Sequence, residues 1–372
     1  MISDFLSKNE LLKKLLKVNK NLLVLVCLIF FCGLLLLYSA SKGNIKPWAL
    51  RQFVYFVLFL PVCIAISIIN IQFWFRHSYI IYCCGLFLLI LVEIVGYKSM
   101  GATRWINLGF MRIQPSEIMK VCFILAMARY FFQCGPSDPQ KNMKLIKPLL
   151  LFLVPFILIL KQPNLGTALI LVAIMISILF LVGVQIWKFI LCFTIGLCCI
   201  PVVWKYGLHD YQQRRVLIFL KPESDPLKSG YNITQSKIAI GSGGIWGRGF
   251  LDGTQGQLEF LPEKHTDFIF TILSEEFGFI GSLSVIIMYL ILFIFLLYII
   301  TKCKHSYGKI IVGGIFTNLF CHFFINIGMV TGILPVVGTP LPLLSYGGSI
   351  TASTLISIGF ILNVDIHRDY EI

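Results

Sequence analysis

Four ionisable side chains lie within five consecutive positions of the sequence: Glu263, Lys264, His265 and Asp267. A long apolar run begins directly after them. A carboxylate or an imidazole can take a proton from a reacting hydroxyl, and a cation can stabilise a phosphate that leaves. Because charge beside a long apolar run is costly in a membrane, this group indicates a working site at a membrane boundary.

Other segments could take part in the same chemistry. Arg104 stands beside Trp105, so that a cation adjoins an indole in one connector. Lys161 opens a polar turn between two apolar runs, and Arg214 and Arg215 form a further pair of cations. These five residues are candidate substrate-binding residues.

Glu117 and Lys120 lie three positions apart at the start of an apolar run. At this spacing the two side chains share one helical face, where they can form an ion pair that lowers the cost of charge in lipid. The pair has a structural and a functional interpretation, and the sequence favours neither.

The composition fixes the class of protein. Hydrophobic residues make up 58% of the 372 residues, charged residues only 13%, and the mean hydropathy is +0.87. This predicts an all-α polytopic membrane protein. Ten runs are each predicted to cross once, where a crossing needs roughly 20 residues: 21–40, 49–70, 79–97, 116–134, 147–160, 164–184, 187–206, 267–300, 309–330 and 350–364, of which 147–160 and 350–364 are shorter and 267–300 is longer.

Lysine and arginine indicate the orientation, because short cationic loops are retained in the cytoplasm. They predict a basic cytoplasmic segment over 1–20, seven transmembrane helices over 21–206, a large extracytoplasmic loop over 207–266 between helices 7 and 8, three helices over 267–364, and a cytoplasmic tail over 365–372. Both termini are thus expected in the cytoplasm. The net charge of +14 suits anionic lipid head groups. Membrane embedding argues against a nucleic-acid partner.

Cysteine and glycine give weaker signals. Nearly all 12 cysteines lie in apolar runs and are expected to act as small apolar side chains, without a zinc site. The glycine cluster 241–249 lacks the ending of a phosphate-binding loop, which favours tight turns over ligand contact. The proline-rich connector 332–349 is apolar but irregular, so we expect it to be buried or to line a groove for a long apolar ligand.

Four of these segments, 101–120, 161–167, 253–270 and 332–349, together resemble the signatures of the shape, elongation, division and sporulation (SEDS) family of cell-wall proteins. The resemblance covers nearly the whole chain. Residues 253–270 and 332–338 are more similar to the elongation branch, RodA, than to the division branch, FtsW.

The resemblance implies a peptidoglycan glycosyltransferase. Such an enzyme joins disaccharide units of lipid II, the undecaprenyl-pyrophosphate disaccharide pentapeptide, on the outer face of the bacterial cytoplasmic (inner) membrane during cell elongation. It also implies a class B penicillin-binding protein as a crosslinking partner, together with other proteins of the elongation complex. The family's catalytic carboxylate lies in the motif Thr-Asp-Phe-Ile-Phe, which here places it at Asp267.

The reaction fits that residue. Converting an α-linked sugar pyrophosphate into a β-1,4 bond inverts the anomeric carbon, so one general base must deprotonate the acceptor hydroxyl. Desolvation at an apolar boundary strengthens a carboxylate as a base. The sequence shows no dedicated acidic metal cage and predicts no cofactor, but it leaves open a divalent cation, Mg²⁺ or Mn²⁺, between Asp267 and the substrate pyrophosphate.

Asn164 departs from the family, which usually has Asp at this position of the Gln-Pro-Asp-Leu-Gly-Thr motif. An amide is neither a base nor an anionic metal ligand, so we expect it to cap a helix or turn.

Two other functions compete with polymerisation. A lipid-linked precursor flippase would use Glu93, Glu117 and Lys120 for gating or proton coupling, but the polar residues gather outside rather than near the bilayer centre. A scaffold without catalysis would not need the intact motif around Asp267.

Overall fold

The computed structural model describes residues 14–99, 102–107, 109, 111–134, 142–202, 204–205, 213, 217–219, 229–254 and 263–370. Arg214 and Arg215, most of the predicted segment 1–20 and about half of the predicted loop 207–266 therefore lie outside the described residues.

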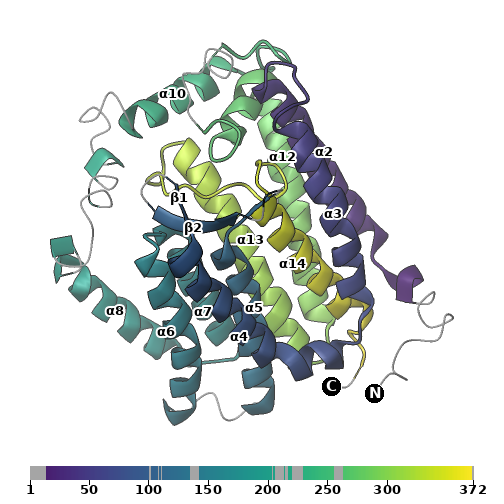
Figure 1. The fold of residues 1–372 in the computed structure, drawn as a ribbon, viewed down its shortest axis with the longest axis vertical. Helices are drawn as coiled ribbons and strands as arrows, with labels where there is room; N and C mark the ends of the chain where they lie inside the picture. Colours follow the sequence, from purple (N-terminus) through teal and green to yellow (C-terminus); the bar gives the residue numbers. More distant parts are fainter. Residues whose placement is uncertain are drawn as a thin grey trace.

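The described chain is a bundle of long apolar helices (Figure 1). The first group is α2 (Lys20–Ala40), α3 (Ala49–Ile68), α4 (Ile71–Val95), α5 (Pro115–Cys134), α6 (Ile146–Lys161), α7 (Leu165–Leu181) and α8 (Ile186–Val202). After α10 (Ser229–Ser242) follow α12 (Ile269–Lys302), α13 (Ser306–Val330) and α14 (Gly348–Ile366), and a short 3₁₀ turn, Asn142–Leu145, precedes α6. Asparagine caps several of these helices: Asn19 Oδ1 accepts from Leu22 N, and Asn70 Oδ1 accepts from Gln72 N.

Six of these helices, α2, α3, α4, α12, α13 and α14, are long and apolar enough to cross a membrane. Two further apolar helices, α7 and α8, are shorter, with 17 residues each. The protein is therefore a mostly helical, multi-pass membrane protein. Helix α8 has no buried residue and lies at the outer edge of the bundle, on the left of Figure 1.

Hydrogen bonds join helix ends that the predicted topology places on the same side of the membrane. Asn19, before α2, donates to Asp365 near the end of α14 at 3.4 Å, and Lys304 N, after α12, donates to Arg368 O. Arg129 near the end of α5 donates to Arg76 O near the start of α4. The predicted cytoplasmic ends thus lie together, and α10 and the strands lie at the opposite pole (Figure 1).

One connector is not helical, which differs from the all-α prediction. Strands β1 (Tyr97–Ser99), β2 (Ala102–Asn107) and β3 (Arg112–Ile113) form a small antiparallel sheet in the order β1-β2-β3. In the first hairpin Ser99 pairs with Ala102. The sheet satisfies backbone donors and acceptors between α4 and α5 that no helix covers.

Helix α12 is broken at Gly278, where φ is 63° and ψ is −157°. The glycine cluster 241–249 fills the break. Arg248 N and Gly249 N donate to Glu275 O and Glu276 O, while Phe279 N and Ile280 N donate to Gly244 O and Ile245 O. The four bonds satisfy backbone groups that the broken helix would otherwise leave unpaired.

Candidate active site

Asp267 lies in a tight turn, residues 263–268, directly before α12. The carbonyl oxygen of Glu263 accepts from the backbone N–H groups of Thr266, Asp267 and Phe268 at 3.1, 3.2 and 3.4 Å. Glu263 itself has a left-handed φ of 59°. A residue with a Cβ occupies this region only when its surroundings enforce it.

Three consecutive carbonyl groups fasten this turn to distant parts of the chain. His265 O accepts from Tyr346 N at 2.9 Å, and Thr266 O accepts from Ser345 Oγ at 2.6 Å. Asp267 O accepts from Asn326 Nδ2 at 2.9 Å, and the same amide donates to Thr339 O at 2.7 Å. The proline-rich connector and α13 therefore fix the backbone of Asp267 on both sides.

The carboxylate of Asp267 lies against Gly338. A Cβ built on Gly338 would be 3.2 Å from Asp267 Oδ2, and Gly338 has a φ of 78° that favours glycine. Two buried polar atoms of the residues that hold this turn, Asn326 Oδ1 and Thr339 Oγ1, have no hydrogen-bond partner among the described residues.

His265 is held between two aromatic rings. It stacks on Trp48, with ring centroids 4.4 Å apart and an interplanar angle of 6°, and lies 5.7 Å from the ring of Tyr346. Burial lowers the pKa of His265, and the nearby Glu263 opposes this shift. Its imidazole is therefore neutral at pH 7. Lys264 is buried beside it, with 5% of its surface exposed.

Arg104 does not stand free to receive a phosphate. Its Nε donates to Gln162 O at 2.9 Å and a terminal nitrogen donates to Pro163 O, so it braces the turn between α6 and α7. Trp105, next to it, lies in β2 and is half-buried. Lys161 is exposed at the end of α6.

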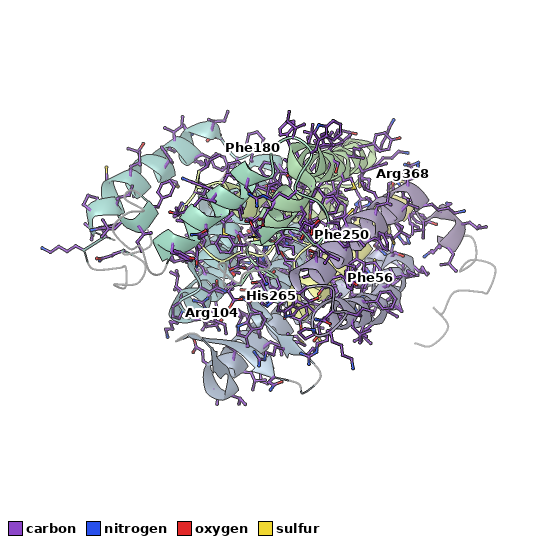
Figure 2. The ribbon with its side chains drawn as sticks, turned by 90° about the horizontal axis from the view of Figure 1, so that it is seen from above. Phe56, Arg104, Phe180, Phe250, His265 and Arg368 are labelled. Carbon is purple, nitrogen blue, oxygen red and sulfur yellow. The ribbon has the colours of Figure 1, made fainter. Side chains whose placement is uncertain are left out.

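The same turn approaches the connector that carries Gly338. A Cβ on Gly166 of α7 would be 2.8 Å from Val337 Cγ1 and 3.1 Å from Thr339 Cγ2. The segments of Arg104, Lys161 and Asp267 thus adjoin one another through the connector. Viewed from above, Arg104 and His265 project onto neighbouring parts of the molecule (Figure 2).

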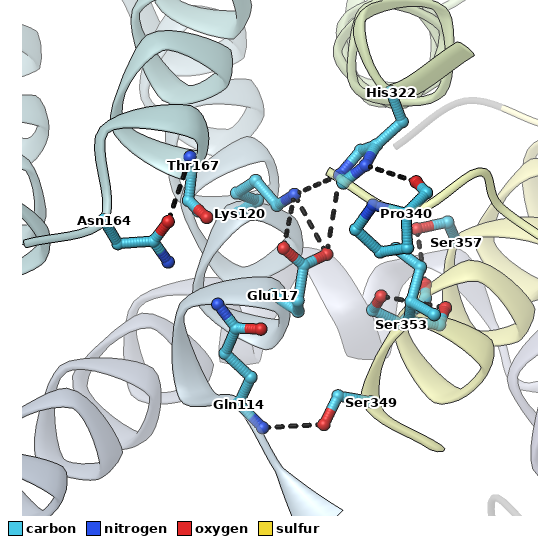
Figure 3. Close-up of polar contacts among 11 residues, drawn as sticks. Gln114, Glu117, Lys120, Asn164, Thr167, His322, Pro340, Ser349, Ser353 and Ser357 are labelled. Atoms are coloured by element: carbon cyan, nitrogen blue, oxygen red, sulfur yellow. Dashed lines mark hydrogen bonds and ion pairs between the residues drawn. The ribbon is translucent and has the colours of Figure 1, made fainter. Parts of the chain in front are cut away.

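Asn164, where the family motif has Asp, caps α7. Its Oδ1 accepts from Thr167 N at 3.5 Å (Figure 3). The amide performs this role as an Asp would.

Glu117 and Lys120 of α5 form a buried cluster with His322 of α13 (Figure 3). Lys120 Nζ lies 3.0 Å from both carboxylate oxygens of Glu117 and 2.7 Å from His322 Nε2. His322 Nδ1 lies 3.2 Å from Pro340 O. Because a carbonyl only accepts, Nδ1 carries the proton, and Nε2 accepts from the ammonium of Lys120. The cluster ties α5 and α13 to the connector beside Asp267.

The sequence matches the FtsW/RodA/SpoVE family, described as cell cycle proteins, over residues 15–370. The chain belongs to this family.

Individual relatives match over almost their full length. The peptidoglycan glycosyltransferase MrdB of Escherichia coli K12 is 40% identical over 350 residues, which cover 93% of each chain. A probable peptidoglycan glycosyltransferase FtsW of Wigglesworthia glossinidia brevipalpis is 36% identical and covers 97% of this chain and 96% of its own.

Two solved structures share the fold. One, described as the structural coordination of polymerization and crosslinking by a peptidoglycan synthase complex, has a TM-score of 0.83 at 30% identity, covering 95% of this chain and 99% of its own. The rod shape determining protein RodA of Thermus thermophilus has a TM-score of 0.72 at 27% identity, covering 95% and 98%. The elongation branch of the FtsW/RodA/SpoVE family is therefore represented among the relatives.

Four residues that hold the site were not predicted from the sequence: Trp48, His322, Asn326 and Ser345. A signal for two of them was present. Asn318, His322 and Asn326 recur every four residues within an apolar run, which places three polar side chains on one face of α13. All three are buried. In the described ranges no three His, Cys, Asp or Glu side chains are grouped to hold a metal ion.

Proposed function

We propose that this protein is a peptidoglycan glycosyltransferase that polymerises lipid II on the outer face of the cytoplasmic membrane during cell elongation. Its relative in Escherichia coli, 40% identical across 93% of both chains, is named for that activity. The single observation that carries the proposal within the structure is the fixed position of Asp267 at the buried connector.

In the proposed mechanism, Asp267 takes the proton from the acceptor hydroxyl while the pyrophosphate leaves from the opposite face of the sugar. Three hydrogen bonds to neighbouring carbonyls hold its backbone, so little reorganisation is needed at the reaction step.

The leaving pyrophosphate needs cations as its charge develops. We assign this role to Lys161 and Lys264, with Arg214 and Arg215 as further candidates outside the described residues. Arg104 contributes by bracing residues 162–163, since its guanidinium already donates to two carbonyls there. Trp105 offers its face to a sugar ring, and Glu263 and His265 shape the turn around Asp267.

The proposed topology has ten crossing helices, a large outer loop over 207–266 and both termini in the cytoplasm. It is supported by the hydrogen bonds that gather alternate helix ends at one pole. The proposed partners are a class B penicillin-binding protein and other elongation proteins. The similar structure that couples polymerization with crosslinking supports such a partner.

The test is glycan-strand formation from labelled lipid II by the full-length protein with its cognate class B penicillin-binding protein. Asp267→Asn keeps the shape of the side chain but cannot accept a proton as a base, so we expect polymer to fall by at least about 10²-fold. Asp252→Asn, an exposed carboxylate near the same pole, is the matched control and should retain activity. Polymer from a folded Asp267→Asn variant at the wild-type rate would overturn the assignment.

A chelator separates two roles for the carboxylate. Activity that survives EDTA supports a base, whereas activity that is lost and returns with Mg²⁺ or Mn²⁺ supports a metal ligand shared with the pyrophosphate.

A lipid-linked precursor flippase is the second candidate, because Glu117, Lys120 and His322 form a buried charged cluster between helices. Transport of a fluorescent lipid II analogue across vesicles, without polymer from the wild type, would favour it. Neither polymer nor transport would favour a scaffold.

A further inference from the structure

A groove of about 600 Å³ opens between α4, α5 and α6, near the pole where α5 ends and α6 begins. These three helices lie next to one another at the end of the bundle away from α10 (Figure 1). The residues that matter for the argument are Tyr79, Tyr82, Tyr130, Gln133, Lys147 and Val154.

Two tyrosines hold the walls of the groove in place. Pro155 in α6 has no N–H to donate to Leu151 O, and the hydroxyl of Tyr82 donates to that oxygen at 2.7 Å. The hydroxyl of Tyr130 in α5 donates to Lys144 O, directly before α6, at 2.7 Å. The groove is therefore a fixed feature of the packing of α6 on α4 and α5.

The groove changes from polar to apolar along its length. On α6, Lys147 lies seven residues before Val154, a rise of about 10 Å along the helix. On α4, Tyr79 precedes Leu86 by the same spacing. One end therefore has hydroxyl, amide and ammonium groups, and the other has aliphatic side chains. Val154 is 46% exposed and Leu150 is 56% exposed, so the apolar part opens to the outside of the bundle.

Positive charge gathers at the polar end. No carboxylate in the described ranges lies within ion-pair distance of Lys147. Arg129 lies over the ring of Tyr79, 4.5 Å from its centroid, and its buried Nε has no hydrogen-bond partner among the described residues. From Arg129 to Lys147 the sequence holds four basic residues against one acid, Asp138.

We propose that this groove binds one anionic glycerophospholipid. Its phosphate lies beside Lys147, in the positive potential that Arg129 reinforces, and one acyl chain follows Leu86, Leu150 and Val154. An ammonium beside a phosphate, with tyrosines at the interface and an apolar track below, matches the chemistry of a lipid from head group to chain. The proposal rests on the groove and on membrane embedding, not on catalysis, so failure of the polymerase assignment would leave it intact.

Native mass spectrometry of the full-length protein, titrated with phosphatidylglycerol or with phosphatidylcholine of the same acyl chains, tests the proposal. We expect saturable binding of one phosphatidylglycerol that phosphatidylcholine does not match. Lys147→Gln should weaken it about fivefold, as expected for one cation near a lipid surface. Val154→Trp, which fills the apolar track from an exposed position, should weaken it independently.

Lys302→Gln is the matched control. Lys302 is an exposed lysine at the end of α12, with Nζ 5.7 Å from the ring of Tyr298, but it lies outside the groove. Its substitution should leave binding unchanged. Equal binding of both lipids, or equal loss with Lys147→Gln and Lys302→Gln, would overturn the proposal. Displacement of phosphatidylglycerol by undecaprenyl phosphate at lower concentration would also overturn it and assign the groove to an isoprenoid.

Discussion

At the scale of single residues, the site depends on a carboxylate whose backbone is held by distant parts of the chain. Donors from the connector and α13 fix the carbonyls of His265, Thr266 and Asp267. The motif around Asp267 could be found from its charges, because ionisable residues beside an apolar run are rare. Asn326 and Ser345 could not, because each is joined to the turn only by the folded chain, at separations of 59 and 79 residues.

Gly338→Ala should lower polymerisation at least about tenfold, because a displacement of about 1 Å at a reacting group is costly. The new methyl group would lie 3.2 Å from Asp267 Oδ2 on a backbone with φ of 78°. Lipid II polymerisation measures the effect. Gly183→Ala is the matched control, because Gly183 has a similar left-handed φ of 85° but its Cβ would meet nothing within 4 Å. A similar loss in both variants would contradict a specific effect on Asp267.

Lys120→Met should destabilise the protein by about 3–5 kcal/mol, because it leaves the carboxylate of Glu117 buried without its cation. Thermal unfolding followed by intrinsic fluorescence in detergent measures this. The double variant Glu117→Gln with Lys120→Met removes both charges and should recover most of the loss. If the double variant is as unstable as Lys120→Met, then the charge left unpaired is not the cause.

At the scale of elements, the apolar helices could be predicted from the sequence, because each is a long run of apolar residues. The break in α12 could not. Gly278 follows Glu275 and Glu276 within the predicted run 267–300, and what makes it a break is the glycine cluster 241–249, which donates to and accepts from its flanking residues. The small sheet of β1, β2 and β3 was missed for a similar reason, since its pairing is set by the helices that it connects.

Gly278→Ala should strongly lower the yield of folded protein and its unfolding temperature. A Cβ there would be 2.3 Å from Gly247 N on a backbone with φ of 63°. Gly241→Ala is the control, because its Cβ meets nothing within 4 Å and lies in helix α10. Size-exclusion profiles and melting curves of the two variants give the comparison. Equal behaviour would show that the cluster does not hold the break rigidly.

At the scale of the whole molecule, buried imidazoles make the stability depend on pH. Burial lowers the pKa of His367 to about 4, against about 6.5 when it is unfolded, and it also lowers the pKa of His305. Between about pH 4 and about pH 6.5 the unfolded chain therefore binds more protons at His367 than the folded chain does. This stability is therefore fully present above about pH 6.5 and declines as the pH falls toward 4.

For His367 alone, lowering the pH from about 7 to about 5 should cost roughly 2 kcal/mol of stability. His367→Gln removes the titrating ring and should flatten this part of the pH dependence of the melting temperature. A variant that loses as much stability as the wild type over this range would rule out His367 as the cause.

The hydrogen bond of Tyr82 in the α4–α6 groove has a consequence for how this sequence can evolve. Tyr82 supplies the hydrogen bond that Pro155 denies to Leu151 O. Without Pro155 the hydroxyl of Tyr82 would compete with a backbone N–H for Leu151 O, and without Tyr82 that carbonyl would lose its donor. Among descendants of this gene, loss of a proline should release its tyrosine from selection, whereas loss of the tyrosine first should be rare. Tyr82 and Pro155 should therefore be inherited as a unit.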